Sequence, residues 1–186
     1  MAEPTPEPRT TFKTVVVLVM FFAVLGAVVV FGALSFFARP VTTIILVRHA
    51  EKVIDPNNND QDLSSAGQAR AQELVRILGD AGINAIYATQ YKRTVQTAKP
   101  LADKLGLPIV QIDSKKTADL LTQIRTNHRG QVIFIVGHNN TLPEIIAALG
   151  GPQHLPESEY DDLYVVTVYR TGKARVVKIK YGEVPQ

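Results

Sequence analysis

One uninterrupted apolar run, Val15 to Phe37, precedes a chain in which short apolar and polar stretches alternate. The run contains no charged residue. At about 1.5 Å per residue it spans roughly 34 Å, enough for a hydrocarbon core of about 30 Å. It therefore predicts one transmembrane helix at residues 15–37. A cleaved signal peptide is the alternative, with a weak small-residue exit at Ala33-Leu34-Ser35. The proline-rich and charged residues 1–14 predict a disordered tail.

The alternating part begins after Arg39-Pro40, which ends the apolar helix. Apolar periodicity predicts four strands, at 42–47, 85–88, 109–112 and 131–136. It predicts four helices between and after them, at 64–78, 93–105, 117–127 and 142–149. A closing hairpin is predicted at 163–169 and 173–181, with its turn at Thr171-Gly172. Strands that alternate with helices indicate a mainly parallel sheet covered on both faces. We therefore expect an α/β domain at residues 41–183, a three-layer sandwich with helices on both sides of a central sheet.

Composition narrows the range of partners. The chain has 186 residues and a formal net charge of +3, a mild excess that does not indicate a nucleic-acid partner. It contains no cysteine, which excludes disulfides, thiolate catalysis and cysteine-ligated zinc. Four basic residues alternate with apolar ones near the C-terminus, and we interpret this pattern as a protected edge strand rather than a lipid-binding surface. They are Lys173, Arg175, Lys178 and Lys180.

Basic residues on either side of the apolar run suggest its orientation. Arg9 and Lys13 precede it and Arg39 follows it. Basic residues favour the cytoplasmic side of a membrane span. We therefore expect a single-pass membrane protein with its N-terminus inside and its folded domain on the extracytoplasmic side.

Reactive residues follow three of the predicted strands. Arg48 and His49 end the first, Arg93 follows the second, and His138 follows the fourth. Ligands of open parallel sheets bind beyond the carboxyl ends of the strands, so these side chains should meet. Arginine offers a planar, permanently charged fork that suits phosphoryl oxygens. The sequence therefore predicts a phosphate site. The chain's other two histidines are interpreted as structural: His128 and His154.

The helix that follows His138 should add to this site. Thr141-Leu142-Pro143-Glu144 fits a capping box with proline in the first turn. The positive N-terminal end of the helix would then lie beside the bound anion. We expect Thr141 and Glu144 themselves only to cap the helix.

Four motifs in order resemble the histidine phosphatase superfamily, in its phosphoglycerate mutase-like branch. They are Arg48-His49, Leu63-Ser64-Ser65-Ala66-Gly67, Arg93-Thr94-Val95-Gln96-Thr97-Ala98 and Val136-Gly137-His138. The resemblance covers about residues 42–169. The start Arg48-His49-Ala50-Glu51 is similar to that of smaller members, in which alanine replaces the glycine usual after Arg-His.

The resemblance implies a phosphatase that acts on phosphoric monoesters or phosphoramidates. His49 would attack phosphorus and become phosphohistidine, while a backbone carbonyl fixes its other ring nitrogen. Arg48, Arg93 and His138 would hold the phosphoryl oxygens, with no metal or other cofactor. Two alternatives stay open: a phosphoglycerate mutase-type phosphotransferase and a non-catalytic phosphate-binding module.

The proton donor is the weak point of this resemblance. Mutase-type members supply an acid from a long insertion, and the segment from Asp113 to Thr117 is too short to hold one. Glu51 is the candidate donor, and an ion pair with Lys52 or Arg93 is its alternative role. Asp161 and Asp162 precede a strand and are alternative donors if they reach the site, although a surface loop is expected for them. A third alternative is that no strong acid is needed, because phosphoramidates and acyl phosphates have better leaving groups than alkyl phosphates. Expected substrates are a phosphorylated small molecule, a lipid or sugar phosphate, or a phosphoprotein.

Overall fold

The computed structural model describes residues 8–37, 41–169 and 172–183. The chain divides into two compact units, residues 1–39 and 40–186. The first unit contains one helix, α1 (Pro8–Phe37). Its segment Phe12–Ser35 is long and apolar enough to cross a membrane, although a signal sequence would pass the same test.

Helix α1 begins within the segment predicted to be disordered. Proline is tolerated in the first turn of a helix, where its missing N–H has no partner to lose. No further proline or glycine lies between residues 9 and 14, so the helix extends back from the apolar run to Pro8. Residues 1–7 of the predicted tail lie outside the described residues.

The second unit is built on one six-stranded sheet in the order β3-β2-β4-β1-β5-β6. The strands are β1 (Thr42–Arg48), β2 (Ile83–Thr89), β3 (Ile109–Ile112), β4 (Val132–Gly137), β5 (Asp162–Val168) and β6 (Ala174–Lys180). Strands β1 to β4 pair in parallel, and β5 and β6 join antiparallel at one side. The prediction of a mainly parallel sheet is confirmed, and β6 is an edge strand as interpreted.

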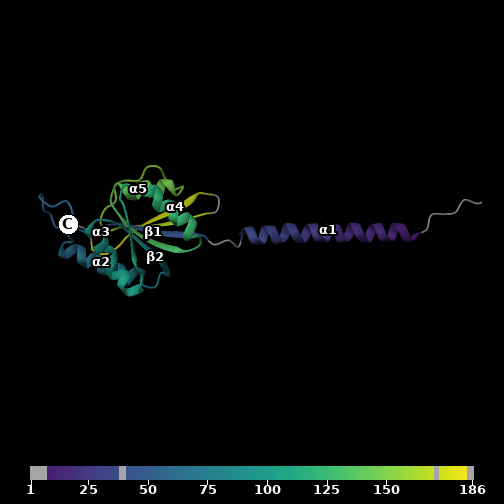
Figure 1. The fold of residues 1–186 in the computed structure, drawn as a ribbon, viewed down its shortest axis with the longest axis horizontal. Helices are drawn as coiled ribbons and strands as arrows, with labels where there is room; N and C mark the ends of the chain where they lie inside the picture. Colours follow the sequence, from purple (N-terminus) through teal and green to yellow (C-terminus); the bar gives the residue numbers. More distant parts are fainter. Residues whose placement is uncertain (1–7, 38–40, 170–171, 184–186) are drawn as a thin grey trace, which may run out of the picture. The chain divides into compact units, whose positions relative to one another are not determined.

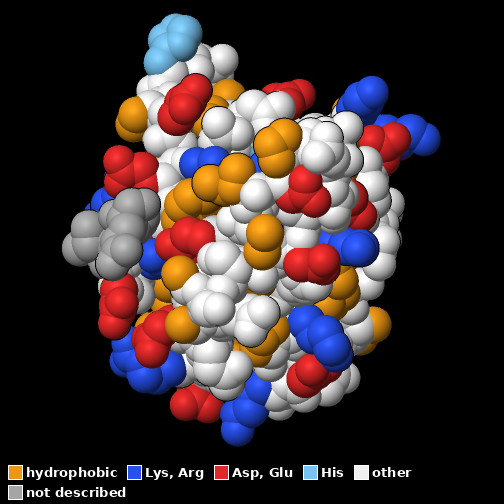
Figure 2. All heavy atoms as spheres, turned by 90° about the vertical axis from the view of Figure 1, so that its left-hand side faces the viewer, with side chains coloured by type: hydrophobic (Ala, Val, Ile, Leu, Met, Phe, Trp, Pro, Cys, Tyr) orange, Lys and Arg blue, Asp and Glu red, His pale blue; other side chains and the backbone are white. Residues whose placement is uncertain are grey.

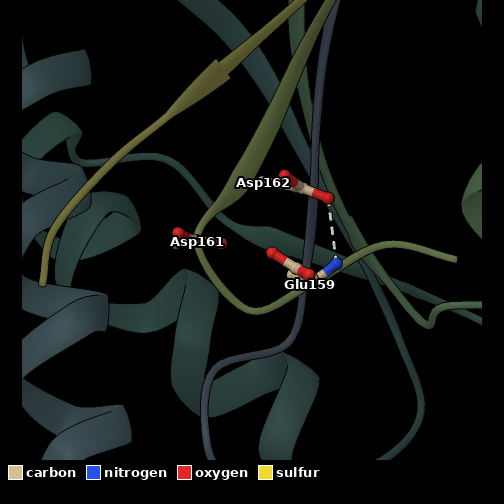
Figure 3. Close-up of side chains that lie close together, drawn as sticks. All are labelled: Glu159, Asp161 and Asp162. Carbon is tan, nitrogen blue, oxygen red and sulfur yellow. Dashed lines mark hydrogen bonds between the residues drawn. The ribbon is translucent and has the colours of Figure 1, made fainter. Parts of the chain in front are cut away.

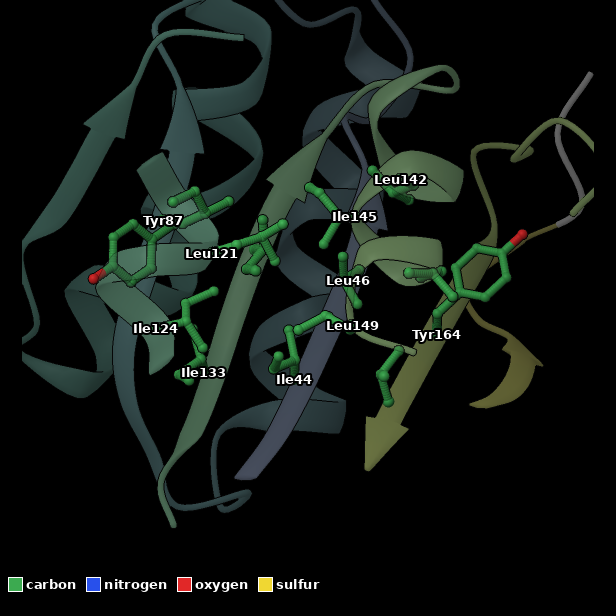
Figure 4. Close-up of a cluster of buried hydrophobic side chains, with 14 residues drawn as sticks. Ile44, Leu46, Tyr87, Leu121, Ile124, Ile133, Leu142, Ile145, Leu149 and Tyr164 are labelled. Carbon is green, nitrogen blue, oxygen red and sulfur yellow. The ribbon is translucent and has the colours of Figure 1, made fainter. Parts of the chain in front are cut away.

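Helices cover both faces of this sheet (Figure 1). They are α2 (Ser65–Leu78), α3 (Lys92–Leu105), α4 (Thr117–Asn127) and α5 (Thr141–Ala148). Apolar residues of α2 and α3 pack on one face, and those of α4 and α5 pack on the other. Figure 4 shows the second of these cores, where Leu121 and Ile145 lie against strand residues such as Ile44 and Ile133. The three-layer prediction is therefore confirmed.

Every predicted boundary in this unit lies within two residues of the observed one. The largest difference is in β2, which begins at Ile83 rather than at residue 85. Asn84 interrupts the apolar pattern there, at an irregularity in the pairing with β4. Its side-chain oxygen accepts a hydrogen bond from the Val132 N–H at 2.9 Å, so a polar residue maintains the ladder. Of the predicted hairpin turn, Thr171 lies outside the described residues, and Gly172 has a φ of 78°.

The strand order explains why the reactive residues meet. β4 lies between β1 and β2, with Arg48 opposite Gly137 and Ala88 opposite Val136. The carboxyl ends of these three parallel strands are therefore neighbours at one edge of the sheet. The chain enters the sheet at Thr42, at the opposite end of β1.

Helix α2 is held close to the loop that follows β1. Its N-cap Ser64 accepts a hydrogen bond from the Gly67 N–H and donates from its own N–H to the Glu51 carbonyl. A Cβ added at Gly67 would lie 2.0 Å from that carbonyl oxygen. Glycine is therefore required at this position by the closeness of the two backbones.

We predict that Gly67→Ala destabilises the protein. Helix propensity alone would stabilise the alanine variant by about 1 kcal/mol. The clash with the Glu51 carbonyl should outweigh this gain and cost about 1–3 kcal/mol, as overpacking does elsewhere. Thermal unfolding of the full chain measures the difference, and a variant as stable as the wild type would contradict the close packing.

Candidate active site

His49 follows β1 directly and is only 4% exposed. Its backbone N–H donates to the Gly137 carbonyl of β4 at 2.9 Å. Its ring Nδ1 lies 2.8 Å from the Ala50 carbonyl oxygen. A carbonyl can only accept, so Nδ1 carries the proton and the neutral ring has its lone pair on Nε2. The predicted contact with a backbone carbonyl is confirmed.

The surroundings of His49 keep its ring neutral. Burial lowers the pKa of His49 to about 3, and the positive charge of Arg93 and Arg48 adds to this effect together with His138. The hydrogen bond to Ala50 acts in the opposite direction but does not compensate. At neutral pH the ring is therefore an uncharged imidazole, the form that can act as a nucleophile.

His138 follows β4, and its ring centroid lies 5.3 Å from that of His49. Burial, then Arg93 and Arg48, lower its pKa to about 4. Its Nε2 lies 2.9 Å from the hydroxyl of Thr89 at the end of β2. Three neighbouring strand ends thus converge on a pair of neutral imidazoles.

The capping box predicted after His138 is wrong. The N-cap of α5 is Asn140, which makes no side-chain cap hydrogen bond. The Thr141 hydroxyl instead accepts from the backbone N–H of His138 at 2.8 Å. Thr141 is already the first residue of the helix, so its side chain reaches back to the strand end. Its observed role is to hold the backbone of His138.

The two predicted arginines lie beside these imidazoles in matching environments. Nη1 of Arg48 donates to the Ser158 carbonyl at 2.9 Å, and its guanidinium lies 4.2 Å from the ring centroid of Tyr160. Nη1 of Arg93 donates to the Asn59 carbonyl at 3.3 Å, and its guanidinium lies 4.5 Å from the ring centroid of Tyr91. Each guanidinium group is thus oriented by one backbone carbonyl and the face of one tyrosine ring.

Each of the two guanidinium groups has one buried N–H donor that forms no hydrogen bond with the described residues. The Nε atoms of Arg48 and Arg93 are buried and have no hydrogen-bond partner among the described residues. Buried donors are nearly always satisfied, and charge-assisted donors form their strongest hydrogen bonds with carboxylates and phosphates. An anion is therefore the kind of ligand that suits these two groups.

The tyrosines that hold the arginines also contact the histidines. The ring of Tyr160 lies 5.8 Å from that of His49, and the ring of Tyr91 lies 5.2 Å from that of His138. Sequence reasoning missed both. Tyr91 was detectable, because it lies between the end of β2 and Arg93. Tyr160 was not, because only the pairing of β5 with β1 brings it to the site.

A threonine of the third motif couples the nucleophile to the second arginine. The Ala50 N–H donates to the Thr97 hydroxyl at 2.9 Å, and that hydroxyl donates to the Arg93 carbonyl at 2.7 Å. Ala50 also supplies the carbonyl that fixes the His49 ring. The tautomer of His49 and the position of α3 therefore depend on one short series of hydrogen bonds.

Glu51 is engaged by a residue that was not expected. Arg70 of α2 donates to both of its carboxylate oxygens, at 2.6, 2.9 and 3.0 Å. Of the expected partners, Lys52 binds Gln61 and Arg93 binds the Asn59 carbonyl. In this geometry Arg70 engages both carboxylate oxygens of Glu51 as hydrogen-bond acceptors.

Asp161 and Asp162 were expected in a surface loop, and this expectation is wrong, since both are buried. They precede and begin β5, where the adjacent edge strand β6 brings Lys178 and Lys180 over them. Figure 3 shows the two carboxylates together with Glu159, whose backbone N–H donates to Asp162. This hydrogen bond and the two lysines lower the pKa of Asp162, although its burial acts to raise it.

The three carboxylates also form the one group of possible metal ligands found among the described residues. Lys180 donates to Glu159 and Asp161, so lysine already balances their charge. The same turn carries the Ser158 carbonyl and the Tyr160 ring that orient Arg48. These acids therefore fix the loop beneath Arg48.

The remaining predicted residues lie away from the two imidazoles. His128 is structural as interpreted, since its ring contacts the Tyr87 hydroxyl and the Gln131 side chain. His154 is exposed. On the face that Figure 2 draws, basic and acidic side chains are interspersed.

Comparisons with known proteins agree with this geometry. Residues 44–114 match the sequence profile of the histidine phosphatase superfamily (branch 1). A protein named phosphoserine phosphatase 1, from Hydrogenobacter thermophilus, is 35% identical over 75 residues, which cover 38% of this chain. That match spans 36% of the relative's length.

Solved structures share the fold over most of the chain. One described as a phosphohistidine phosphatase SixA from Agrobacterium tumefaciens has a TM-score of 0.59 and 25% identity, over 76% of this chain and 99% of that one. A SixA complexed with tungstate has a TM-score of 0.63 and 15% identity, over 74% and 96%. One described as an alpha-ribazole-5'-P phosphatase from Escherichia coli has a TM-score of 0.63 and 14% identity, over 75% and 96%.

The profile match includes the Arg48-His49 and Arg93 motifs. Residues 44–114 are therefore similar to the histidine phosphatase superfamily (branch 1), and the chain shares its fold with solved structures described as phosphatases.

Proposed function

We propose that the protein is a phosphatase that hydrolyses phosphoric monoesters or phosphoramidates through a phosphohistidine on His49. The observation that carries this proposal is the state of the His49 ring, which is neutral and has its lone pair on Nε2. The unpartnered Nε donors of Arg48 and Arg93 support it, because both charges act on the His49 ring and charge-assisted donors bind phosphates strongly. A non-catalytic binding module would not need a nucleophile in this state.

The chemistry follows from these groups. Nε2 of His49 forms a bond to phosphorus while the bond to the leaving group breaks. Arg48 and Arg93 compensate the charge on the phosphoryl oxygens throughout, so transition-state stabilisation is electrostatic and requires no movement of the protein. Water then attacks the phosphohistidine, and the electron pair of the N–P bond returns to His49.

The segment that would have to hold a long insertion is short. The turn between β3 and α4, Asp113 to Lys116, is short, as the sequence indicated. This argues against a phosphoglycerate mutase, which supplies an acid from an insertion. The structure described as a phosphohistidine phosphatase SixA matches over nearly all of its own length. Phosphohistidine on a protein is therefore the first substrate to test, before sugar, lipid and small-molecule phosphates.

We further propose that α1 anchors the protein in a membrane, with the catalytic unit on the extracytoplasmic side. The segment Phe12–Ser35 supports the anchor by its length and composition. Arg9, which precedes the segment, and Lys13, in its first turn, support the orientation. A cleaved signal sequence is the competing proposal.

We predict that His49→Ala lowers turnover by at least about 10³-fold, because the covalent step loses its nucleophile. A panel of phosphohistidine protein, phosphomonoesters and phosphosugars measures this with the full chain. His154→Ala is the matched control, since this exposed histidine lies on a surface loop. A His49→Ala protein that retains most of its activity would disprove the mechanism.

We predict that Glu51→Gln affects stability more than turnover. It leaves the guanidinium of Arg70, whose side chain is 5% exposed, without its anion, which should cost roughly 3 kcal/mol or more. Below the unfolding temperature, kcat should stay within about tenfold of wild type. A general acid contributes about 10²–10⁴-fold, so a loss of that size would restore Glu51 as the donor. The double variant with Arg70→Met should lose less stability than the sum of the single variants.

We predict that a membrane-impermeant maleimide labels His154→Cys in intact cells. The native chain has no cysteine, so the wild type is an unlabelled control and any label reports this exposed position. Labelling only after permeabilisation would reverse the proposed orientation. A mature protein that starts beyond residue 35 and leaves the membrane fraction would favour the signal sequence.

A further inference from the structure

A series of hydrogen bonds begins at the second imidazole and ends at the backbone. Nε2 of His138 lies 2.9 Å from the Thr89 hydroxyl, which lies 2.9 Å from the Thr94 hydroxyl. The Thr94 hydroxyl in turn lies 2.7 Å from the Tyr91 carbonyl and 2.9 Å from the Thr89 carbonyl. His138 and both threonines are buried.

The direction of these hydrogen bonds follows from counting protons. A hydroxyl donates one hydrogen, and a carbonyl only accepts. The Thr94 hydroxyl therefore donates its hydrogen to a carbonyl and accepts a hydrogen bond from the Thr89 hydroxyl. The hydrogen of the Thr89 hydroxyl is then already donated to Thr94, so the Thr89 oxygen accepts a hydrogen bond from Nε2 of His138. Neutral His138 is thus the tautomer protonated on Nε2, with its lone pair on Nδ1.

The two imidazoles therefore have opposite tautomers. His49 is protonated on Nδ1 and offers the lone pair of Nε2, as a nucleophile requires. His138 has only Nδ1 left for a ligand, because Nε2 is bound to Thr89. A lone pair on Nδ1 repels a phosphoryl oxygen. His138 can therefore donate a hydrogen bond to phosphate only after Nδ1 has taken up a proton.

The charges around His138 make this uptake depend on the ligand. Arg48, Arg93, His49 and Tyr91 lie near the ring, and Asp113 and Thr89 line the same small cavity. Burial and the two guanidinium groups keep the ring neutral when no ligand is bound, with a pKa of about 4. A bound dianion has the opposite effect, because a nearby negative charge favours the protonated imidazole.

We propose that His138 takes up a proton together with the phosphorylated substrate and delivers it to the leaving group, with Thr89 as the positioning residue that imposes this coupling. The inference rests on the proposed phosphatase activity. It supplies a proton donor in place of the carboxylates considered for this role, which are engaged by basic residues in the part of the chain that the structure describes. Glu51 is held by Arg70, and Asp161 and Asp162 are held by lysines.

Each step balances. In the first, His49 Nε2 bonds to phosphorus, the bond from phosphorus to the leaving group breaks, and the leaving atom receives its electron pair and the Nδ1 proton of His138. In the second, water attacks phosphorus, its proton passes to Nδ1 of His138, and the N–P electron pair returns to His49. The net reaction consumes one water and releases phosphate and the free leaving group.

Sulfate tests the coupling without any turnover, because it remains a dianion between pH 6 and 8. Calorimetry of the full chain, in buffers of different ionisation enthalpy, should show uptake of about one proton per sulfate bound. The binding constant should then fall about tenfold per pH unit. Thr89→Val frees Nε2, lets neutral His138 carry its proton on Nδ1, and should abolish both effects. Thr89→Ser restores the hydroxyl and should restore both.

Two results would overturn the coupling. One is sulfate binding to the wild type without proton uptake, and the other is uptake by Thr89→Val equal to that of the wild type. If Thr89→Val does not fold, ¹⁵N NMR of the wild-type imidazoles decides instead. The inference requires ligand-free His138 to carry its proton on Nε2, and a proton on Nδ1 contradicts it.

Leaving groups test the donation itself. A poor leaving group needs the proton more than a good one does. His138→Gln should therefore lower kcat/KM for phosphoserine at least about tenfold more than for p-nitrophenyl phosphate. An equal loss of kcat/KM on both substrates would show that His138 only binds phosphate, and would reject its role as proton donor. Proton-coupled sulfate binding without turnover of any phosphate would reject the proposed function and the donation while leaving the coupling in place.

Discussion

The hydrogen bond from His49 Nδ1 to the Ala50 carbonyl is the interaction on which the site depends. It determines which ring nitrogen holds the lone pair, and so whether His49 can act as a nucleophile. The carbonyl is held in turn, because the Ala50 N–H binds Thr97 and Thr97 binds the Arg93 carbonyl. Gly67 allows the Glu51 carbonyl and helix α2 to approach closely behind this loop. A change in any of these contacts would move both the nucleophile and an arginine.

The acidic side chains near the site are paired with basic residues other than Arg48 and Arg93. The acids that could neutralise Arg48 and Arg93 are engaged elsewhere: Glu51 with Arg70, and Asp162 with Lys178 and Lys180. The two guanidinium groups are oriented by neutral carbonyls and tyrosine rings instead. They therefore remain available to an anion, and their uncompensated charge helps to keep both imidazoles neutral.

Most of the fold could be predicted because its signals are local. Periodicity located each strand and helix of the second unit, and the strand ends indicated where Arg48, His49, Arg93 and His138 meet. Contacts between distant segments could not be predicted in this way. Arg70 reaches Glu51 across 19 residues, and Ser158 reaches Arg48 across 110. No pattern along the chain distinguishes such partners from ordinary surface residues.

The covalent bond between phosphorus and His49 is the central feature of the proposed mechanism, and a single experiment addresses it directly. Rapid quenching of the full chain with ³²P-labelled substrate, followed by proteolysis, should recover acid-labile and alkali-stable label on the fragment that contains His49. The label should form no more slowly than the leaving group is released in the first turnover. Turnover that proceeds with label on another residue, or without any labelled protein, would contradict the account.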